Sequence, residues 1–538
     1  MEATGLVLGK AIMNDTKTIL LLTALIFGVS DAAKILILHP MHAASHILTL
    51  RQVASALSLQ GHHIEIIRWK DEHNYPPIIH PNITEHELAM NNTEGNIPYL
   101  SVEERASFQL PQDLLWSKGT SWTALPWNAF FTVGVFCSTL FGQEQLIDHL
   151  RRRDFDIAIV DLLYNECSLA LAHHLGLPAI GYWAFTFAGG EPQYTTAFCP
   201  PSSVPFILSH FEDSMTFLQR FFNHLLALGS HLVMQVQFIV TNNKIQLHLP
   251  GTPHPTTLLA NLSGVLINSH PSLDYPRLLP PSFLNVGGMQ IHPPNPLPTE
   301  LENFITGSGE AGIILFTMGI SFNSNVVPPS LIDDFMKAFG RLKQRVLMKL
   351  EEDYSNPPPN VKLVRWLPQQ DILAHPKTRL FFTHCGMHGV IEALHYGVPM
   401  VGMPVFADQE DVLIRIQQKG VGIGVPKNAD EETIYRAITE VIENPRYKEN
   451  AIQLSSILKD NAEEPLNRAL WLVNHVINTK GAEHLKLSAR HLGFFQFFGI
   501  DVIAFLLLAI YVCWFYLLTM IKKITEILVL SGQKAKVH

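Results

Sequence analysis

The side chains best placed to do chemistry lie between Trp366 and Gln409, in the stretch WLPQQDILAHPKTRLFFTHCGMHGVIEALHYGVPMVGMPVFADQ. Within it, an apolar, β-rich run at 380–383 leads into the tight junction His384-Cys385-Gly386. A helix that begins near Gly386 would point unpaired backbone N–H groups and the positive end of its dipole beyond the strand. That arrangement suits a phosphate group.

The same stretch continues as a strand–helix–strand unit. Residues 390–396 have helical apolar spacing and stop at Gly397-Val398-Pro399. Residues 399–405 form a second apolar run of strand type, which ends in Asp408-Gln409. Polar residues therefore sit at the carboxyl ends of both strands, the edge at which open α/β sheets bind ligands.

A second group that could do chemistry is His42-Ala43-Ala44-Ser45-His46. Histidines four apart on a helix can bind zinc, but the glutamate of HExxH is missing and no third ligand is evident. The alternative is a general base at the start of a helix, since a neutral imidazole within about 3 Å of a hydroxyl can take its proton. His42 could also be a bland surface residue, and we expect His39 to be one.

A carboxylate on the other ring nitrogen would orient such a base and stabilise its cation. Asp161 is the candidate, because it ends the strand-type run FDIAIVD at 155–161 and precedes a helical pattern at 167–176. From the residues alone, a helix N-cap or a turn residue is the competing interpretation.

The elements that must position these residues alternate between strand and helix. A strand at 34–40, a helix at 45–59 and a strand at 63–69 open the chain, which predicts a parallel sheet. After the proline-rich segment 279–300, strand patterns return at 313–318, 344–350 and 361–364, with a helix at 330–342. Gly420, Gly422 and Gly424 alternate in a strand-like run, and the first strand is not followed by GxGxxG, which excludes an NAD-dependent oxidoreductase.

The length and composition of the chain limit the number of domains and the possible partners. A chain of 538 residues is too long for a single hydrophobic core. We therefore expect a first domain at 33–278, a linker at 279–300 and a second domain at 301–485. The formal charge of −9 and the lack of a basic stripe exclude nucleic acid as a partner. The five cysteines show no CxxC spacing, so neither a zinc site nor a disulfide framework is indicated; one pair could form in an oxidising lumen.

Both ends of the chain point to a membrane. Residues 1–32 read as a signal peptide cleaved near Ala32, with a retained anchor helix as the alternative. Residues 502–521 carry no charge and are long enough to span a bilayer, which leaves 522–538 as a cytosolic tail. Lys534 and Lys536 resemble a dilysine retrieval signal, with a merely solvated basic tail as the alternative. Triplets that could accept a glycan begin at Asn82, Asn91 and Asn261.

The region from 74 to 150 and that from 185 to 238 are irregular and aromatic. Their aromatic residues could line an apolar acceptor pocket or could belong to the core. They are Phe130, Phe131, Phe136, Trp183, Phe185, Phe187, Phe206, Phe217, Phe221 and Phe222. A second element at the membrane surface is possible near 217–238.

The stretch from Trp366 to Gln409 resembles the signature of the UDP-glycosyltransferases, the family that includes the UDP-glucuronosyltransferases. The resemblance runs from about Lys34 to the C-terminus. It implies an α/β fold of two facing Rossmann-like domains, the GT-B type, followed by one C-terminal transmembrane helix. It also implies inverting transfer of a hexosyl group from a UDP-sugar, as co-substrate, to a hydroxyl of a small lipophilic acceptor. The expected setting is the endoplasmic reticulum membrane, with a luminal body, no permanently bound cofactor, no metal and a possible homo-oligomer.

The resemblance assigns roles to individual residues. His46 matches the catalytic histidine and Asp161 the aspartate that orients it. In the donor site, the matching residues are Trp366 for stacking on uracil, Gln369 for the base or ribose, His384 and Gly386 for the phosphates, Glu392 for the ribose hydroxyls, and Asp408 with Gln409 for the sugar hydroxyls.

The chain departs from the family pattern at several positions. Cys385 stands where members usually have glycine, and His388 where an asparagine commonly contacts the diphosphate. The loop after Phe316 reads Gly319-Ile320-Ser321 in place of Gly-Ser. These changes could weaken donor binding, or His388 and Ser321 could substitute for the usual residues.

The donor sugar is left open between glucose and glucuronate. Glucuronosyl members of vertebrates carry an arginine near the end of the first domain, which suits a carboxylate, and Asn268 aligns there. The segment INSHPSLDYPR resembles the sequences of invertebrate members, and we therefore favour UDP-glucose as the donor. Two other functions remain as alternatives: lipid or glycan biosynthesis by the same fold, and nucleotide-sugar binding without turnover.

Overall fold

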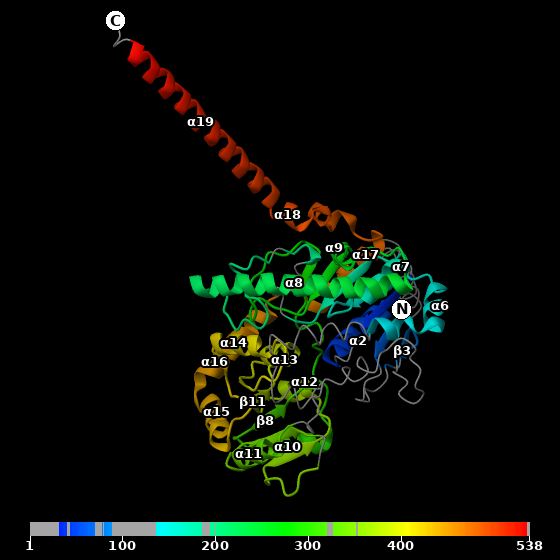
Figure 1. Cartoon of the computed structure of the whole chain (residues 1–538). Helices are drawn as coiled ribbons and strands as arrows, with labels where there is room; N and C mark the ends of the chain where they lie inside the picture. Colours follow the sequence, from blue (N-terminus) through cyan, green and yellow to red (C-terminus); the bar gives the residue numbers. More distant parts are fainter. Residues whose placement is uncertain are drawn as a thin grey trace, which may run out of the picture. The chain divides into compact units, whose positions relative to one another are not determined.

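The computed structural model describes residues 32–39, 44–69, 78, 80–88, 136–185, 194–197, 199–319, 327–350 and 353–534. Residues up to Lys486 form one compact unit, and those from Leu487 form another. The first unit holds two parallel sheets and the helices that cover them (Figure 1). The signal-peptide segment, His42, Ser321 and the end of the tail lie outside the described residues.

The first sheet has seven strands in the order β3-β2-β1-β4-β5-β6-β7, and every pair is parallel. Its inner strands β1, β2, β4, β5 and β6 are almost continuously buried, because helices cover both faces of a parallel sheet. The expected strands near the N-terminus and before Asp161 are confirmed. The bounds are β1 Lys34–His39, β2 His63–Trp69, β3 Ile83–Leu88, β4 Ile157–Asp161, β5 Ala179–Trp183, β6 Gly264–Ile267 and β7 Phe283–Asn285.

The helices of this part follow the strands. The expected helix after the first strand is confirmed, and so is the one after Asp161. The bounds are α2 Ala44–Leu59, α6 Glu144–Arg151, α7 Glu166–His174, α8 Phe217–His248 and α9 Pro255–Ala260.

The second sheet has six parallel strands in the order β10-β9-β8-β11-β12-β13. The strands are β8 Ile313–Thr317, β9 Arg345–Lys349, β10 Val361–Val364, β11 Thr378–Thr383, β12 Met400–Gly402 and β13 Gly422–Gly424. The helices are α10 Thr299–Thr306, α11 Pro329–Gly340, α12 Gln369–Ala374, α13 Met387–His395, α14 Gln409–Gln418, α15 Glu431–Glu443 and α16 Pro445–Lys459.

Both sheets share the strand order of doubly wound nucleotide-binding folds. The direction of winding reverses between β1 and β4 in the first sheet, and between β8 and β11 in the second. Ligands of such sheets bind at the carboxyl ends of the strands at this switch point. The fold therefore marks two places where side chains for binding and chemistry should gather.

Two elements that follow the first expected domain in the sequence contact the first sheet. β7 pairs with β6, although its residues lie inside the segment expected to be the linker. α17 (Pro465–Asn478) packs on α2 and β7 of the first sheet, although its sequence follows the second sheet. Asn474 hydrogen-bonds His62 across 3.0 Å, and Arg468 donates to the carbonyl of Asn285 at 2.7 Å. The chain thus returns to its first half before it leaves the body.

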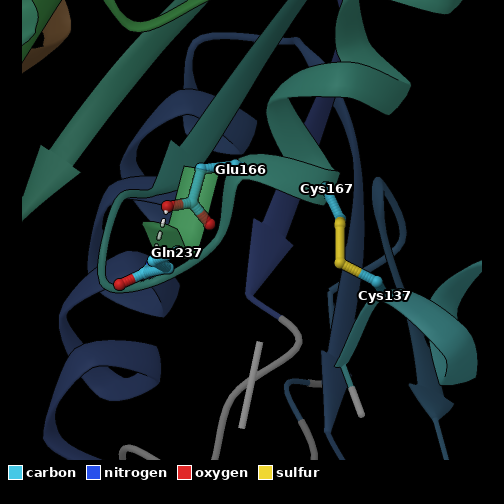
Figure 2. Close-up of a disulfide and its surroundings, with 4 residues drawn as sticks. All are labelled: Cys137, Glu166, Cys167 and Gln237. Atoms are coloured by element: carbon cyan, nitrogen blue, oxygen red, sulfur yellow. Dashed lines mark hydrogen bonds between the residues drawn. A yellow bond between two sulfur atoms is a disulfide. The ribbon is translucent and has the colours of Figure 1, made fainter. Parts of the chain in front are cut away.

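One disulfide joins Cys137 to Cys167, with the two Cα atoms 5.4 Å apart (Figure 2). The pair was left open by the sequence, because the partners are 30 residues apart and carry no spacing signal. Cys167 is the second residue of α7, so the bond ties the helix that follows β4 to the segment before α6. Cys199, Cys385 and Cys513 are free.

The second unit contains an apolar helix where the membrane helix was expected, a candidate span. α18 (Phe494–Phe497) is short, and α19 runs over Ile500–Lys534. Within α19, Ile500–Leu528 is long and apolar enough to cross a membrane, and its most apolar stretch is not buried in the protein. At about 1.5 Å per residue the helix exceeds the roughly 30 Å of hydrocarbon that the expected span of 502–521 would match.

Candidate functional site

His46 and Asp161 meet at the switch point of the first sheet. His46 lies in the first turn of α2, directly after β1, and Asp161 is the last residue of β4. The distance from His46 Nδ1 to Asp161 Oδ2 is 2.7 Å, and both side chains are buried. The contact between the two residues is therefore as the sequence predicts.

The electrostatics keep Asp161 ionised. Its burial alone would raise its pKa, but the charge of His46 and hydrogen bonds from His39 and His46 hold the pKa well below its usual range. The other oxygen accepts from the backbone N–H of Leu163 at 3.1 Å. An ionised carboxylate accepts a hydrogen bond from a protonated Nδ1, so the lone pair of the neutral imidazole of His46 lies on Nε2. That nitrogen is the one able to take a proton from a ligand.

The expectation that His39 is a surface residue is wrong. Its side chain is 1% exposed, and its Nδ1 lies 2.9 Å from the same oxygen of Asp161. The reason is topological: His39 is the last residue of β1, which pairs with β4 at the switch point. His39 is a polar residue at the end of an apolar run of strand type, and this position could have indicated from the sequence that its side chain is buried.

Three ligand-type atoms, from His39, His46 and Asp161, lie within 4.8 Å of one another, a spacing that could hold a metal ion. The two Nδ1 atoms are already satisfied by Asp161. A hydrogen-bonded base thus accounts for this cluster without a metal, whereas the zinc interpretation relied on His42.

A second cluster with metal-ligand spacing joins Glu65, His86 and His149, on β2, β3 and α6. Glu65 Oε2 lies 3.0 Å from Nε2 of His86 and 2.9 Å from Nε2 of His149. The guanidinium of Arg153 donates to the other oxygen at 2.5 Å. Burial would raise the pKa of Glu65, but these hydrogen bonds lower it to about 2. The neighbouring side chains therefore stabilise the ionised carboxylate without a metal.

His388, from the second half of the chain, lies close to His46. Its ring lies 6.1 Å from that of His46, centroid to centroid, and its Nε2 is 3.1 Å from the hydroxyl of Tyr182. Burial, and next the charge of His46, lowers the pKa of His388 to about 3, so the imidazole is neutral. Phe185 covers another side of His46 at 5.1 Å. The side chain of His46 therefore lies among rings from both halves of the chain.

The residues expected to bind the phosphates lie at the switch point of the second sheet. His384 follows β11, and Gly386 is the N-cap of α13. A Cβ at Gly319 would lie 2.6 Å from the ring of His384, and one at Gly386 would lie 2.5 Å from it. Both positions are held to glycine because the imidazole is packed between their backbones.

His384 carries a free hydrogen-bonding group. Its Nδ1 is buried and has no partner among the described residues. Burial, and next the charge of Lys349, lowers the pKa of His384 to about 4. Lys349, at the end of β9, was not singled out from the sequence. A neutral imidazole beside the amino end of α13 is suited to donate to a phosphate oxygen.

Cys385 occupies the position at which the family usually has glycine, and the backbone shows why. Its φ is 66°, in the left-handed region that favours glycine. Its thiol is buried and fills the space beside Gly402, where a Cβ would lie 2.3 Å from the sulfur. The cysteine therefore already adopts the backbone conformation that glycine would supply.

We expect the substitution Cys385→Gly to leave the KM for the UDP-sugar within about threefold of the native value, because the loop geometry is unchanged. Relief of the left-handed strain and loss of the buried thiol oppose each other, each at about 1 kcal/mol. Initial rates against donor concentration and a thermal melt measure the two effects. Cys385→Val is the contrast, since a β-branched residue at positive φ should lower Tm. A tenfold better KM for Cys385→Gly would instead mean that the thiol distorts the phosphate loop.

The residues expected to bind the nucleoside lie on α12 and α13 and just before α12. Trp366 is 52% exposed, so a face of its indole is accessible for stacking. Glu392 is buried and accepts from the side-chain amides of Gln369 at 2.7 Å and Gln370 at 3.4 Å. Burial raises the pKa of Glu392 to about 7. Glu392 is therefore a buried carboxylate that its two glutamine neighbours leave able to bind a ligand through its remaining lone pairs.

Asp408 and Gln409 are both buried at the start of α14. Asp408 occupies the N-cap position without making a capping hydrogen bond, and its Oδ2 has no partner among the described residues. Burial, and next Asp411, raises its pKa to about 7. The side-chain oxygen of Gln409 accepts from the backbone N–H groups of Val405 at 2.8 Å and Phe406 at 3.1 Å. Its amide nitrogen is the group left to donate to a ligand.

The described aromatic residues among those expected around an acceptor divide into three groups. Phe185 lies against His46, whereas Phe136, Trp183 and Phe206 are buried in the protein. Phe217, Phe221 and Phe222 are exposed on α8. Phe130, Phe131 and Phe187 lie outside the described residues. Asn268 is fully buried and donates to the carbonyl of Ala184 at 3.0 Å.

Comparisons with known proteins show the family to which the chain belongs. The family model described as UDP-glucoronosyl and UDP-glucosyl transferase matches residues 33–535. UDP-glucuronosyltransferase 1A10 of Homo sapiens is 34% identical over 489 residues, which are 89% of each chain. UDP-glucuronosyltransferase 2B30 of Macaca fascicularis is 31% identical over 475 residues, 86% of this chain and 88% of that protein.

Solved structures support the fold. The glycosyltransferase VinC, in complex with DTDP, superposes with a TM-score of 0.54 at 16% identity, over 83% of this chain and 100% of that one. A UDP-glucosyltransferase from Polygonum tinctorium, capable of glucosylating indoxyl, gives a TM-score of 0.53 at 16% identity, over 83% of this chain and 99% of that one. With two parallel sheets of the same strand order and a match over most of its length, the chain belongs to the UDP-glucoronosyl and UDP-glucosyl transferase family and is a UDP-glycosyltransferase of the GT-B fold.

Proposed function

We propose that this UDP-glycosyltransferase moves a hexosyl group to a hydroxyl of a small lipophilic acceptor by a single displacement. The acceptor oxygen forms a bond to the anomeric carbon while the bond from that carbon to the UDP oxygen breaks. The acceptor proton passes to Nε2 of His46, and UDP leaves with the electron pair. A single displacement inverts the configuration at the anomeric carbon. Asp161 orients His46 and stabilises the imidazolium that forms.

The observation that carries this proposal is the hydrogen bond between His46 and Asp161, at 2.7 Å, at the switch point of the first sheet. His388, four residues after His384, lies 6.1 Å from the ring of His46. Burial raises the pKa of Asp408 to about 7, and a small opposing effect comes from His46, so the two side chains interact electrostatically. A base, a phosphate end and a carboxylate for sugar hydroxyls thus lie within electrostatic reach of one another, as one transfer reaction requires.

The donor contacts follow from the second half of the site. The indole of Trp366 stacks on the uracil, with Gln369 beside it. The buried Glu392 accepts the ribose hydroxyls, while His384 and the amino end of α13 at Gly386 hold the diphosphate. Asp408 and Gln409 bind the sugar hydroxyls. His388 and Ser321 take the place of the usual phosphate-loop residues.

The setting we propose is the endoplasmic reticulum membrane. α19 crosses the bilayer once, the body lies in the lumen and the tail in the cytosol. An apolar span of this length and the disulfide between Cys137 and Cys167 support a luminal body. The co-substrate is UDP-glucose or UDP-glucuronate, and no permanently bound cofactor is required for the displacement.

The test is a turnover assay with membranes that contain the full chain, a phenolic acceptor and the two UDP-sugars in parallel. We expect UDP release together with a glycoside of inverted anomeric configuration, with UDP-glucose as the better donor because Asn268 replaces the arginine suited to glucuronate. Binding of UDP without turnover of either donor, over a panel of phenols and alcohols, would favour nucleotide-sugar binding alone.

The substitution Glu392→Gln should raise the Kd for UDP by about 10–100-fold, since a hydrogen bond to a charged group contributes roughly 1.5–3 kcal/mol. Calorimetric titration of UDP measures this change. Because the pKa of Glu392 is raised to about 7, the carboxylate is protonated below that pH and UDP binding should weaken there.

The pH profile separates this role from a structural one. In the Glu392→Gln chain the weakening of UDP binding below pH about 7 should flatten, because the titrating group is gone. Glu443→Gln, on the exposed end of α15, is the matched control and should change neither the Kd nor the profile. An unchanged Kd in Glu392→Gln would remove Glu392 from the donor site.

A further inference from the structure

Two histidines and a glutamate meet on one face of the first sheet. Ile67 of β2 pairs with His86 of β3, and Glu65 stands two residues before Ile67. Because side chains alternate between the two faces of a sheet, Glu65 and His86 project to the same face. Helix α6 covers this face, since its Ile147 belongs to the same hydrophobic core as Ile67. The helix also contributes His149 to the group.

The three side chains converge on one point. Oε2 of Glu65 lies 3.0 Å from Nε2 of His86 and 2.9 Å from Nε2 of His149, and the three atoms lie within 4.8 Å of one another. Zinc bonds of about 2.0–2.1 Å at tetrahedral angles place the ligand atoms roughly 3.3 Å apart. The two distances from the carboxylate to the histidines therefore need to widen by about 0.3–0.4 Å to admit the ion.

The two imidazole rings have the separation of a pair that shares an ion. Their centroids lie 5.4 Å apart, and their planes are inclined by 55°. When an imidazole binds zinc through Nε2, its centroid lies about 3.2 Å from the ion. Two such rings at a tetrahedral angle have centroids about 5.2 Å apart. The rings of His86 and His149 therefore need little movement to bind one ion.

The carboxylate of Glu65 is prepared to bind a cation. Burial would raise its pKa, but the hydrogen bonds from His86, His149 and Arg153 lower it to about 2. Arg153 donates to Oε1, so Oε2 is the atom that faces the two histidines. Outer hydrogen bonds of this kind commonly hold the carboxylate ligands of metals. The side chains of His86 and His149 are 27% and 39% exposed, which gives an ion access from solvent.

The types of these ligands favour zinc over other ions. Calcium and magnesium ions prefer oxygen ligands, whereas imidazole nitrogen suits zinc and other transition metals. Two histidines, one glutamate and a water form one of the recurrent ligand sets of zinc. The cluster offers the three protein ligands of that set, and its exposed side leaves room for the water.

The cluster is separate from the residues proposed to carry out the transfer. The register pairs Glu65 with Leu36, three residues before His39 at the carboxyl end of β1. At about 3.3 Å per residue, this level lies about 10 Å from the edge of the sheet that carries His46 and Asp161. An ion at the cluster would instead join β2 to α6 and to β3, the edge strand of the described sheet (Figure 1).

We propose that Glu65, His86 and His149 bind one Zn²⁺ ion, with a water as the fourth ligand, and that the ion fastens β3 and α6 to β2. Coordination bonds then replace the two hydrogen bonds to Oε2. Each Nε2 gives up its proton, either by a shift to the Nδ1 tautomer or by release to solvent, and its lone pair binds the metal. The ion stabilises the folded chain, because the three ligands come together only on folding. This inference goes beyond the proposed function and does not depend on it.

The test measures the binding of zinc itself to the full chain in detergent micelles. Bound metal is first removed with a chelator, and competition with a chromophoric zinc indicator then gives the Kd. We expect a site with a Kd of about 1 µM or tighter in the native chain. The Kd should rise at least about tenfold in His149→Ala and, separately, in His86→Ala. His173→Ala is the matched control, since it removes an exposed histidine of α7, and it should bind zinc as the native chain does.

A thermal melt gives a second readout. Zinc at about a hundred times its Kd should raise Tm by several degrees in the native chain and in His173→Ala, and should leave Tm of His149→Ala unchanged. An equal Kd in the native chain and both cluster variants would overturn the proposal and leave the contacts of Glu65 as hydrogen bonds alone. Zinc binding that is lost only in His46→Ala would overturn it too, because the ion would then lie beside Asp161. Neither readout requires UDP-sugar turnover, so its failure is distinct from a failure of the proposed reaction.

Discussion

Replacing His46 by alanine is expected to lower kcat toward an alcohol acceptor by a factor of about 10²–10⁴, the usual contribution of a positioned general base. The imidazole is held 2.7 Å from Asp161, and its loss removes the group that takes the acceptor proton. The residues proposed to bind UDP belong to the second half of the chain, so the Kd for UDP should change by less than about threefold. Initial rates at saturating donor, with a calorimetric titration of UDP, measure the two quantities.

The control for this variant is His63→Ala. His63 is exposed at the start of β2 on the same sheet, so its loss should leave both kcat and the Kd for UDP unchanged. A His46→Ala chain that keeps more than about a tenth of the native rate with an alcohol would show that His46 is not the base.

Asp161→Asn should cost almost as much as the loss of His46, again about 10²–10⁴ in kcat. The asparagine amide would donate to Nδ1 of His46 where the carboxylate accepts, which moves the ring proton to Nε2 and removes the lone pair. Asparagine has nearly the same size as aspartate, so packing around the buried position is preserved. Steady-state rates of the single variants and of the double variant His46→Ala/Asp161→Asn test this.

The double variant is expected to be little worse than either single one, because two residues that act as a unit do not contribute independently. Asp156→Asn is the control, since Asp156 is an exposed carboxylate just before the same strand. Multiplicative losses in the double variant would mean that Asp161 acts through something other than His46.

Much of the fold could be predicted because its signals are local. Apolar runs, helical spacing and glycine or proline stops lie within a few residues of one another, and they located β1, α2, β4, β11 and α13. The stretch from His384 to Gln409 forms the carboxyl edge of the second sheet as predicted, since parallel strands bring the residues that follow them to one edge.

The features that were missed depend on contacts between distant residues. His39 looks like a surface histidine until β1 is paired with β4, which lies more than a hundred residues later. The return of α17 to the first sheet depends on Asn474 and Arg468 meeting partners near residues 62 and 285. Periodicity within a window carries no information about such pairings.

The same limit applies to the site. His388 was treated as a departure in the phosphate loop, but the structure places it against Tyr182 and beside His46, in the other half of the chain. Cys385 looked like a defect until its φ of 66° showed that the backbone conformation of glycine is kept. In both cases the residue type was visible, and its surroundings were not.

General-base catalysis by His46 is tested most directly by a series of acceptors of graded acidity. The native chain and His46→Ala are compared with an aliphatic alcohol, a simple phenol and an acidic phenol such as 4-nitrophenol, at one donor concentration. A base is needed least when the acceptor is already ionised. The account predicts that the ratio of native to variant rate is largest for the alcohol and falls steadily toward the acidic phenol. A ratio that stays the same across the series would contradict it, because His46 would then act on something other than the acceptor proton.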